Sequence, residues 1–162
     1  MTRRTTLAAA LVSSLGLLGG HATAHAAEIK RASSPGSIAI SPAVTAPPGS
    51  TLVFLSGALP TIADKAAPGT TEAQTRSVLD KLEATLKAEG LGLADVVKAT
   101  VFLVGDPAKG GEIDFAGLNV AWSQRFGTSA QPNKPARSTV KVAGLVAPGA
   151  LVEIEVVAAR AP

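Results

Sequence analysis

The sequence contains no cysteine and no tyrosine, and it has only two histidines, one tryptophan and four phenylalanines. Both histidines, His21 and His25, lie in a segment that reads as a secretion signal. The remaining chain therefore lacks imidazole, thiol and phenol groups. This excludes Ser-His-Asp and Cys-His catalysis, His/Cys zinc sites and thiol redox chemistry. An arginine fork that binds a carboxylate and a glutamate that moves a proton remain available.

Residues 1–26 have the parts of a cleavable signal peptide. Arg3 and Arg4 form the charged start, residues 7–18 the apolar stretch, and residues 24–26 a small-x-small cleavage site. The apolar stretch is shorter than the roughly 20 residues that span a bilayer. Residues 2–7 also fit part of a twin-arginine signal, which leaves both export routes open. We expect a periplasmic or secreted protein that begins near Ala27 and has no membrane association after cleavage.

Cleavage of the leader changes the charge of the protein. The full chain has 15 Lys and Arg against 12 Asp and Glu, a net charge of +3; without Arg3 and Arg4, 13 basic residues face 12 acidic ones, near +1. The basic residues are scattered, and aromatic residues are few. Nucleic-acid binding normally needs a clustered basic surface with aromatic platforms, so no nucleic-acid partner is expected.

The chain after the leader has the size of one domain. A Ser/Pro/Gly-rich flexible entry segment is predicted over residues 27–37, and a single domain over residues 38–162. Apolar runs bounded by turn residues predict strands. These are expected at residues 38–44, an edge strand that contains Pro42, and at residues 52–56, 95–104, 137–143 and 151–158.

Two helices are predicted from apolar periodicity. Thr71 and Gln74 have the spacing of a capping box, and Gly90 is placed to end a helix that reaches Glu89. The apolar face of this helix consists of Val78, Leu79, Leu82 and Leu86. The second helix has Asp114 as its cap and an aromatic and apolar stripe formed by Phe115, Leu118, Trp122 and Phe126. Two helices against one sheet predict an α+β sandwich.

Polar residues alternate with apolar ones in the last two predicted strands. Arg137, Thr139 and Lys141 share one face of the first, and Glu153 and Glu155 share one face of the second. If the two strands pair as a hairpin around the Pro148-Gly149 turn, these side chains become neighbours. The pattern also fits an ordinary exposed face, in which Lys141 and Glu153 form a simple cross-strand pair.

Six motifs occur in order from Ala39 to Ala159. They are Ser41-Pro42; Phe54-Leu55-Ser56-Gly57-Ala58-Leu59-Pro60; Asp95-Val96-Val97-Lys98-Ala99-Thr100-Val101-Phe102; Phe115 with Asn119, Trp122 and Phe126; Pro135-Ala136-Arg137-Ser138; and Val152-Glu153-Ile154-Glu155. In these motifs the chain resembles the reactive intermediate deaminase family, also called Rid or YjgF.

This resemblance implies a chorismate-mutase-like fold of the bacillus type, with one mainly antiparallel sheet and two helices on one face. It also implies a homotrimer with sites in clefts between subunits, and hydrolysis of small 2-imino acids such as 2-iminobutanoate and 2-iminopropanoate to 2-keto acids and ammonia. No metal or organic cofactor is implied. Arg137 matches the family's arginine that grips the substrate carboxylate, and Glu153 matches the glutamate that holds or activates water.

Other site residues follow from the same resemblance. Ser56 and Gly57 match the loop beside the site, and Asn119 matches a family asparagine. Each has a structural alternative, because Ser56 before Gly57 suits a turn and Asn119 can bridge structure from within a helix.

The chain departs from the family pattern at two positions. Thr139 stands where many members have a cysteine, and it still offers a hydroxyl. Ala43 stands where the best-known members carry a tyrosine. The loss of that tyrosine removes a wall and a polar group from the pocket, so the site is expected to be wider or to suit another substrate.

Two other functions are compatible with the sequence. A non-catalytic binder of small carboxylates, or a holdase-like exported protein, would use the same clefts, and the missing tyrosine and the predicted export favour it. The ribonuclease activity sometimes attributed to the family is disfavoured by export, by the near-neutral charge and by the lack of histidine.

Overall fold

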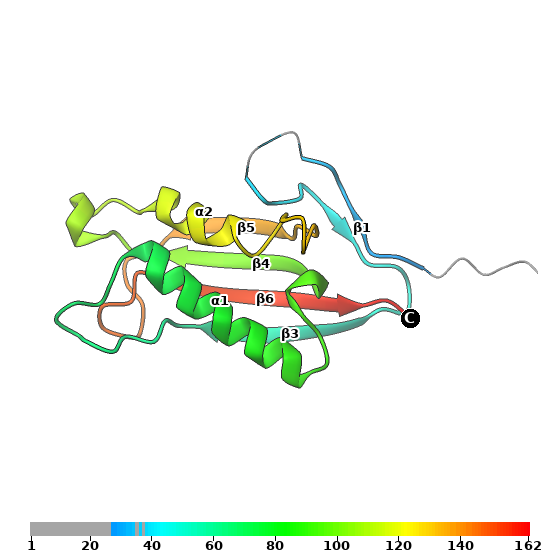
Figure 1. Cartoon of the computed structure of the whole chain (residues 1–162), viewed down its shortest axis with the longest axis horizontal. Helices are drawn as coiled ribbons and strands as arrows, with labels where there is room; N and C mark the ends of the chain where they lie inside the picture. Colours follow the sequence, from blue (N-terminus) through cyan, green and yellow to red (C-terminus); the bar gives the residue numbers. More distant parts are fainter. Residues whose placement is uncertain (1–26, 35, 37) are drawn as a thin grey trace, which may run out of the picture.

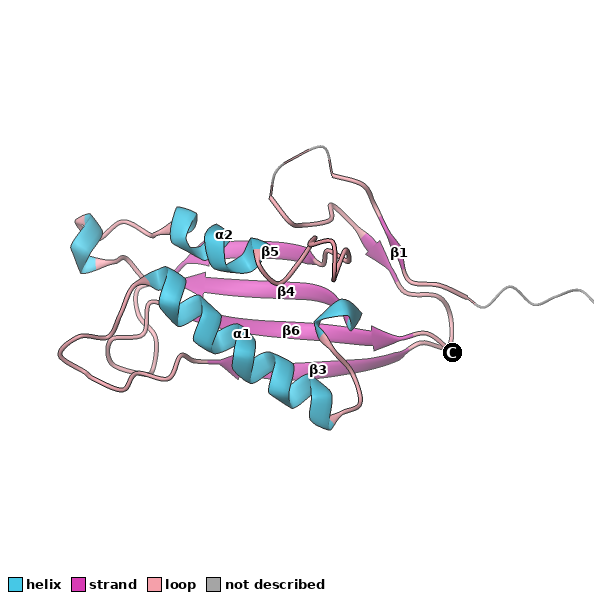
Figure 2. Cartoon of the chain, in the orientation of Figure 1, coloured by secondary structure: helices cyan, strands magenta, loops and turns pink. Residues whose placement is uncertain are grey.

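The computed structural model describes residues 27–34, 36 and 38–162 (Figure 1). Within these residues, a four-stranded sheet with the order β3-β6-β4-β5 carries two α-helices on one face (Figures 1 and 2). The strands are β3 (Thr51–Ala58), β6 (Val152–Arg160), β4 (Val96–Leu103) and β5 (Ala136–Lys141), and the helices are α1 (Thr71–Ala88) and α2 (Phe115–Ser123). The predicted α+β class with both helices on one face of a mainly antiparallel sheet is confirmed.

The hairpin considered for the last two strands does not form. β6 lies between β3 and β4 and is antiparallel to both, whereas β5 is an edge strand that runs parallel to β4. Burial explains this order: Val152, Ile154 and Ala158 of β6 are fully buried, as suits a central strand, whereas Ser138 and Val140 of β5 are exposed.

Helix α1 begins one residue earlier than the capping box predicts. Thr70 is the N-cap, and its side chain accepts a hydrogen bond from the Ala73 N–H at 3.2 Å. The buried Gln74 side chain instead donates to the carbonyl oxygens of Pro68 and Gly149 and accepts from the Leu151 N–H at 2.7 Å. Gln74 therefore ties the helix to the loop that leads into β6. The four predicted apolar residues of α1 are all buried, which confirms its core face.

Helix α2 begins as predicted, because the Asp114 side chain accepts a hydrogen bond from the Gly117 N–H at 3.0 Å. The helix ends at Ser123, before Phe126, but the Phe126 ring still packs in the core and stacks on Trp122 with 4.3 Å between ring centroids. The stripe from Phe115 to Phe126 thus faces the sheet. Phe115 itself remains partly exposed at one end of it.

The segment before β3 does not join the main sheet, so the predicted edge strand over residues 38–44 is wrong. The Ile40 N–H donates to the Ile38 carbonyl at 2.8 Å, which bends the chain sharply there. Only β2 (Val44–Thr45) is a strand, and it pairs with β1 (Lys30–Arg31) in a separate two-stranded sheet beside the end of the main one (Figure 1).

The predicted entry segment contains β1 and is held by Arg31. The guanidinium of Arg31 donates to the carbonyl oxygens of Ala94, Val96 and Lys134 at 2.8 to 3.1 Å. Burial lowers the pKa of Arg31. The predicted signal peptide, residues 1–26, lies outside the described residues. Among those described, no helix is both long and apolar enough to cross a membrane.

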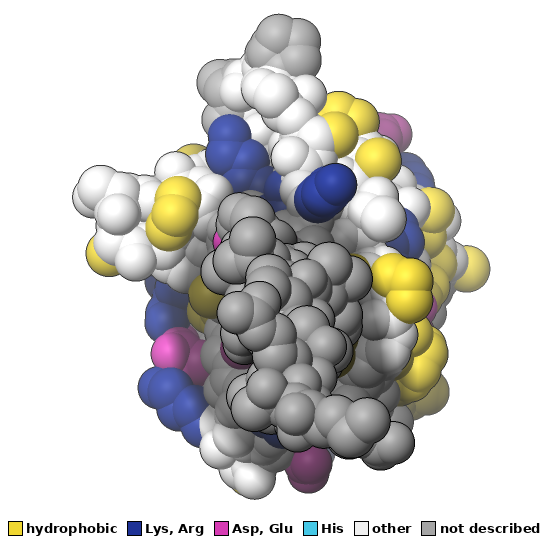
Figure 3. Space-filling model, turned by 90° about the vertical axis from the view of Figure 1, so that its right-hand side faces the viewer, with side chains coloured by type: hydrophobic (Ala, Val, Ile, Leu, Met, Phe, Trp, Pro, Cys, Tyr) yellow, Lys and Arg dark blue, Asp and Glu magenta, His cyan; other side chains and the backbone are white. Residues whose placement is uncertain are grey.

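The face of the sheet away from the helices carries exposed apolar side chains. Leu52 and Phe54 of β3 are 47% and 73% exposed, and Val140 of β5 is 43% exposed. Figure 3 looks at the end of the sheet and shows hydrophobic side chains gathered along one side of the molecule. We call this surface the open face of the sheet.

Candidate active site

Arg137 lies near the start of β5 and points toward the helix layer. Its partner in register on β4 is Ala99, which is fully buried in the core. The central carbon of the guanidinium lies 4.7 Å from the centroid of the Trp122 ring and 5.7 Å from that of Phe115. Both rings come from α2, so the guanidinium rests against aromatic rings at the edge of the sheet, an arrangement that stabilises a cation.

One hydrogen bond fixes the guanidinium. Its Nη2 donates to Oδ1 of Asn119 at 2.7 Å, while Nη1 is buried without a hydrogen-bond partner. Among the residues that the structure describes, no carboxylate forms an ion pair with Arg137. Burial lowers the pKa of Arg137 to about 10, so the group is still charged at neutral pH. A partly buried cation without a counterion is suited to an incoming anion.

Asn119 and Thr139 join Arg137 on the helix-facing side of the sheet. Asn119 lies in the middle of α2, and its side chain accepts a hydrogen bond from Arg137. This contact bridges α2 and β5, which is the structural alternative to a substrate role that the sequence left open for Asn119. Thr139 lies two residues after Arg137 on β5, opposite the buried Val101 of β4. These residues form the arginine half of the candidate site.

Glu153 lies on the open face instead. Its neighbours Val152 and Ile154 are fully buried beneath the helices, so the side chain of Glu153 points to the other side. Its carboxylate packs beside Gly57: a methyl group added to Gly57 would lie 2.0 Å from Oε1 of Glu153. Ser56 and Gly57 belong to an irregular stretch of β3 between Leu55 and Ala58, where the pairing with β6 shifts. Ser56, Gly57 and Glu153 form the glutamate half.

The expectation that Arg137 and Glu153 become neighbours is therefore wrong within one chain. β4 separates β5 from β6, and the two side chains lie on opposite faces of the sheet. The alternative of a Lys141–Glu153 pair is wrong as well. Lys141 Nζ donates to the Gly111 carbonyl at 3.0 Å and lies 3.4 Å from the carboxylate of Glu112.

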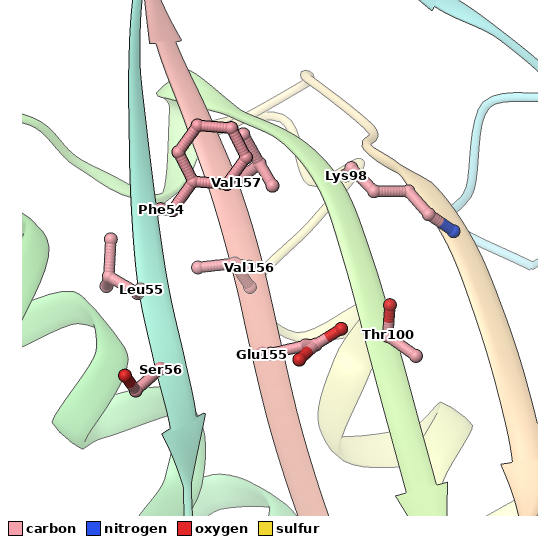
Figure 4. A pocket seen from close by; sticks show the side chains of 8 residues that line it. All are labelled: Phe54, Leu55, Ser56, Lys98, Thr100, Glu155, Val156 and Val157. Carbon is pink, nitrogen blue, oxygen red and sulfur yellow. The ribbon is translucent and has the colours of Figure 1, made fainter.

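A groove on the open face extends the glutamate half. It has a volume of about 320 Å³. Its polar lining consists of Ser56, Lys98, Thr100 and Glu155, beside the apolar Phe54 and Val157 (Figure 4). Thr100 and Glu155 are paired in register, and Lys98 Nζ donates to Ser138 Oγ at 2.7 Å.

Lys98 and Thr100 belong to the motif over residues 95–102, but they were not predicted as lining residues. Their alternation with Ala99 and Val101 in β4 was the signal that could have found them. The contacts of Phe115 and Trp122 with Arg137 were missed as well. The spacing of Phe115, Asn119 and Trp122, four residues and then three, places them on one side of a helix, and this could have indicated a shared partner.

A family model described as Endoribonuclease L-PSP matches residues 37–160. A RutC family protein of Haemophilus influenzae is 40% identical over 123 residues, which are 75% of this chain and 89% of the relative. A 2-iminobutanoate/2-iminopropanoate deaminase of Escherichia coli is 40% identical over 93 residues, which are 57% of this chain and 66% of the relative.

Solved structures agree with these matches. A putative endoribonuclease from Thermotoga maritima superposes with a TM-score of 0.54 at 34% identity, over 82% of this chain and 94% of that one. A YjgF/YER057c/UK114 family member from Mycobacterium tuberculosis gives 0.51 at 30% identity, over 81% and 98%. The chain therefore belongs to the Rid/YjgF family, whose model carries the name Endoribonuclease L-PSP, and the predicted resemblance is confirmed.

Proposed function

We propose that this protein hydrolyses small reactive 2-imino acids to 2-keto acids and ammonia, without a metal or organic cofactor. The observation that carries the proposal is Arg137, a partly buried guanidinium that is oriented by Asn119 and two aromatic rings and has no carboxylate partner among the described residues. Relatives named 2-iminobutanoate/2-iminopropanoate deaminase support this choice of reaction.

In the proposed reaction, Arg137 binds the substrate carboxylate. The planar guanidinium can give two parallel N–H donors to the two carboxylate oxygens. A bound carboxylate also supplies the counterion that Arg137 lacks. Thr139, on the same side of β5, offers a hydroxyl to the substrate. Arg137 thereby fixes the position of the adjacent C=N carbon, and positioning provides much of the rate for an electrophile that is already reactive.

Glu153 is the proposed base. It holds a water molecule and accepts a proton as the water oxygen attacks the carbon of the protonated imine. The resulting tetrahedral intermediate carries one hydroxyl and one amino group on that carbon. The proton then returns to the nitrogen, the C–N bond breaks and ammonia leaves. Glu153 takes the hydroxyl proton as the C=O bond of the keto acid forms, and this proton passes to the departing ammonia, which is released as ammonium. Ser56 and Gly57 shape the wall next to Glu153.

Because Arg137 and Glu153 lie on opposite faces of the sheet in one chain, we propose that the complete site forms between copies. The arginine half of one copy would meet the glutamate half of the next. A head-to-tail contact of this kind closes into a ring when the rotation between neighbouring copies closes, and the proposed ring is a homotrimer. Burial of Leu52, Phe54 and Val140 on the open face would stabilise it.

The test is a coupled assay on the purified protein. An amino-acid oxidase generates 2-iminopropanoate or 2-iminobutanoate in solution, and keto-acid formation is followed with and without the protein. We expect acceleration by the parent protein and a loss of about a hundredfold or more in kcat/KM for Arg137→Ala. Arg76→Ala, which changes a half-buried arginine paired with Glu72 on α1, is the matched control and should be fully active. No acceleration by the parent, or full activity of Arg137→Ala, would refute the proposal.

The arrangement of the halves also favours a second candidate function, a non-catalytic binder of small carboxylates. The arginine half is complete within one chain, whereas Glu153 is not part of it. Calorimetry with 2-oxobutanoate separates the two functions. Arg137-dependent binding without turnover, equally tight in Glu153→Gln, would favour the binder. A holdase-like role would appear as suppressed aggregation of an unfolded client without any requirement for Arg137.

A further inference from the structure

Trp122 connects the N-terminal part of the chain to Arg137. Its side chain is fully buried, and its indole N–H donates to the carbonyl oxygen of Ala39 at 2.8 Å. The same ring lies 4.7 Å from the guanidinium carbon of Arg137. The position of the ring under the guanidinium is therefore fixed by a backbone group that is 83 residues away in sequence.

The segment that supplies this carbonyl is itself held in place. We call residues 39–43 the strap. The Ser41 N–H donates to the carbonyl of Pro135, two residues before Arg137, at 2.9 Å, and the Ala43 carbonyl accepts from the Ala32 N–H at 2.9 Å. Ala39 and Ser41 are both buried. The strap thus contacts the start of β5 directly and the Arg137 side chain through Trp122.

We infer that Trp122, anchored by Ala39, is a positioning residue for the carboxylate grip of Arg137. Asn119 accepts a hydrogen bond from one amino group of the guanidinium, whereas Nη1 has no hydrogen-bond partner. The face of the indole ring supports the plane of the guanidinium, so that the remaining donors point in one direction. The inference rests on the proposed function only in that a carboxylate is the ligand of Arg137.

Calorimetry with 2-oxobutanoate as the probe tests the inference without requiring turnover. Trp122→Leu removes the ring, and we expect it to weaken binding by about tenfold, within the range of measured cation–π contributions. Trp122→Phe keeps a ring but loses the N–H to Ala39, and a smaller loss of about threefold is expected. Val78→Ala is the matched control. Val78 is fully buried on α1 and is not one of the side chains that contact the Arg137 guanidinium, so binding should not change.

A double-mutant comparison separates positioning from a general loss of structure. In an Arg137→Ala background, Trp122→Leu should weaken the residual binding no further, because the group that it positions is gone. Thermal unfolding of every variant shows which remain folded. Trp122 is the only tryptophan of the chain, so a change in its emission when 2-oxobutanoate is added to the parent protein gives a second readout.

The outcomes distinguish this inference from the proposed reaction. Arg137-dependent binding that Trp122→Leu weakens, combined with no hydrolysis of imino acids, would refute the deaminase and uphold the positioning role. Parent-like binding by folded Trp122→Leu would overturn the inference whether or not the protein is an enzyme. So would equal weakening by Trp122→Leu and Val78→Ala, or a parent protein that does not bind 2-oxobutanoate through Arg137.

Discussion

Gly57 lies beside the carboxylate of Glu153, and Gly57→Ala is expected to displace that carboxylate with little effect on the fold. A methyl group at this position would lie 2.0 Å from Oε1 and 2.9 Å from Cδ of Glu153. Both distances are shorter than a non-bonded contact allows, so the carboxylate would have to move. The φ angle of Gly57 is not in the left-handed region, so alanine causes no backbone strain there. The crowding falls on a side chain that can rotate away, and the expected loss of stability is about 1 kcal/mol.

Turnover should respond much more strongly than stability. If Glu153 acts as the base, moving its carboxylate removes a contribution of about a hundredfold, similar to that expected for Glu153→Gln. The coupled imino-acid assay measures the rate, and urea unfolding measures the free energy of unfolding. Gly144→Ala is the matched control, because an added methyl group there meets no atom within 4 Å.

The double variant Gly57→Ala, Glu153→Gln should be no slower than Glu153→Gln alone, since both changes act on the same group. If Glu153 is required for activity but Gly57→Ala turns over as fast as the parent, the reasoning is refuted. The Glu153 carboxylate would then not need the space beside Gly57 in order to act.

Four further predictions follow from the site and the fold. Asn119→Ala removes the acceptor of the Arg137 hydrogen bond and should weaken 2-oxobutanoate binding about fivefold by calorimetry; unchanged affinity would show that Asn119 does not orient the guanidinium. Gln74→Ala breaks three hydrogen bonds to backbone groups and should lower the free energy of unfolding in urea by about 3 kcal/mol, whereas a change below about 0.5 kcal/mol would contradict its bridging role. Because burial lowers the pKa of Arg137 to about 10, carboxylate binding should be constant from pH 7 to 9 and fall as the guanidinium deprotonates above about pH 10; a loss centred near pH 7 would implicate another group. For the predicted signal peptide, mass spectrometry of the exported protein should show a chain that starts at Ala27, and an intact Met1 in a cytoplasmic fraction would contradict export.

Local sequence patterns were sufficient to predict both helices and most strands. The apolar spacing of α1 and the Asp114 cap of α2 depend on residues within a few positions of each other, and both were confirmed. Gln74 shows the limit of such reasoning. Its spacing from Thr71 fits a capping box, but its side chain bonds to groups as far away as Leu151, and a local pattern cannot indicate such a partner.

The order of the strands in the sheet determines where Arg137 and Glu153 lie, and the sequence could not predict that order. The turn at Pro148-Gly149 suggests a hairpin, yet β5 pairs in parallel with β4 and the chain then crosses to the far side of β4 to form β6. A hairpin would have brought Arg137 and Glu153 together, whereas the observed order places them on opposite faces. The residues of both halves could be named in advance, but their separation could be seen only once the sheet was known.

The most direct test of the proposed site is a crystal structure of the protein with 2-oxobutanoate. We predict a trimer in which the ligand carboxylate binds Arg137 of one copy. The carbonyl carbon of the ligand should lie within reach of a water molecule held by Glu153 of the neighbouring copy. A carboxylate bound away from Arg137, or one bound to Arg137 with no Glu153 from any copy nearby, would contradict a catalytic site formed between subunits.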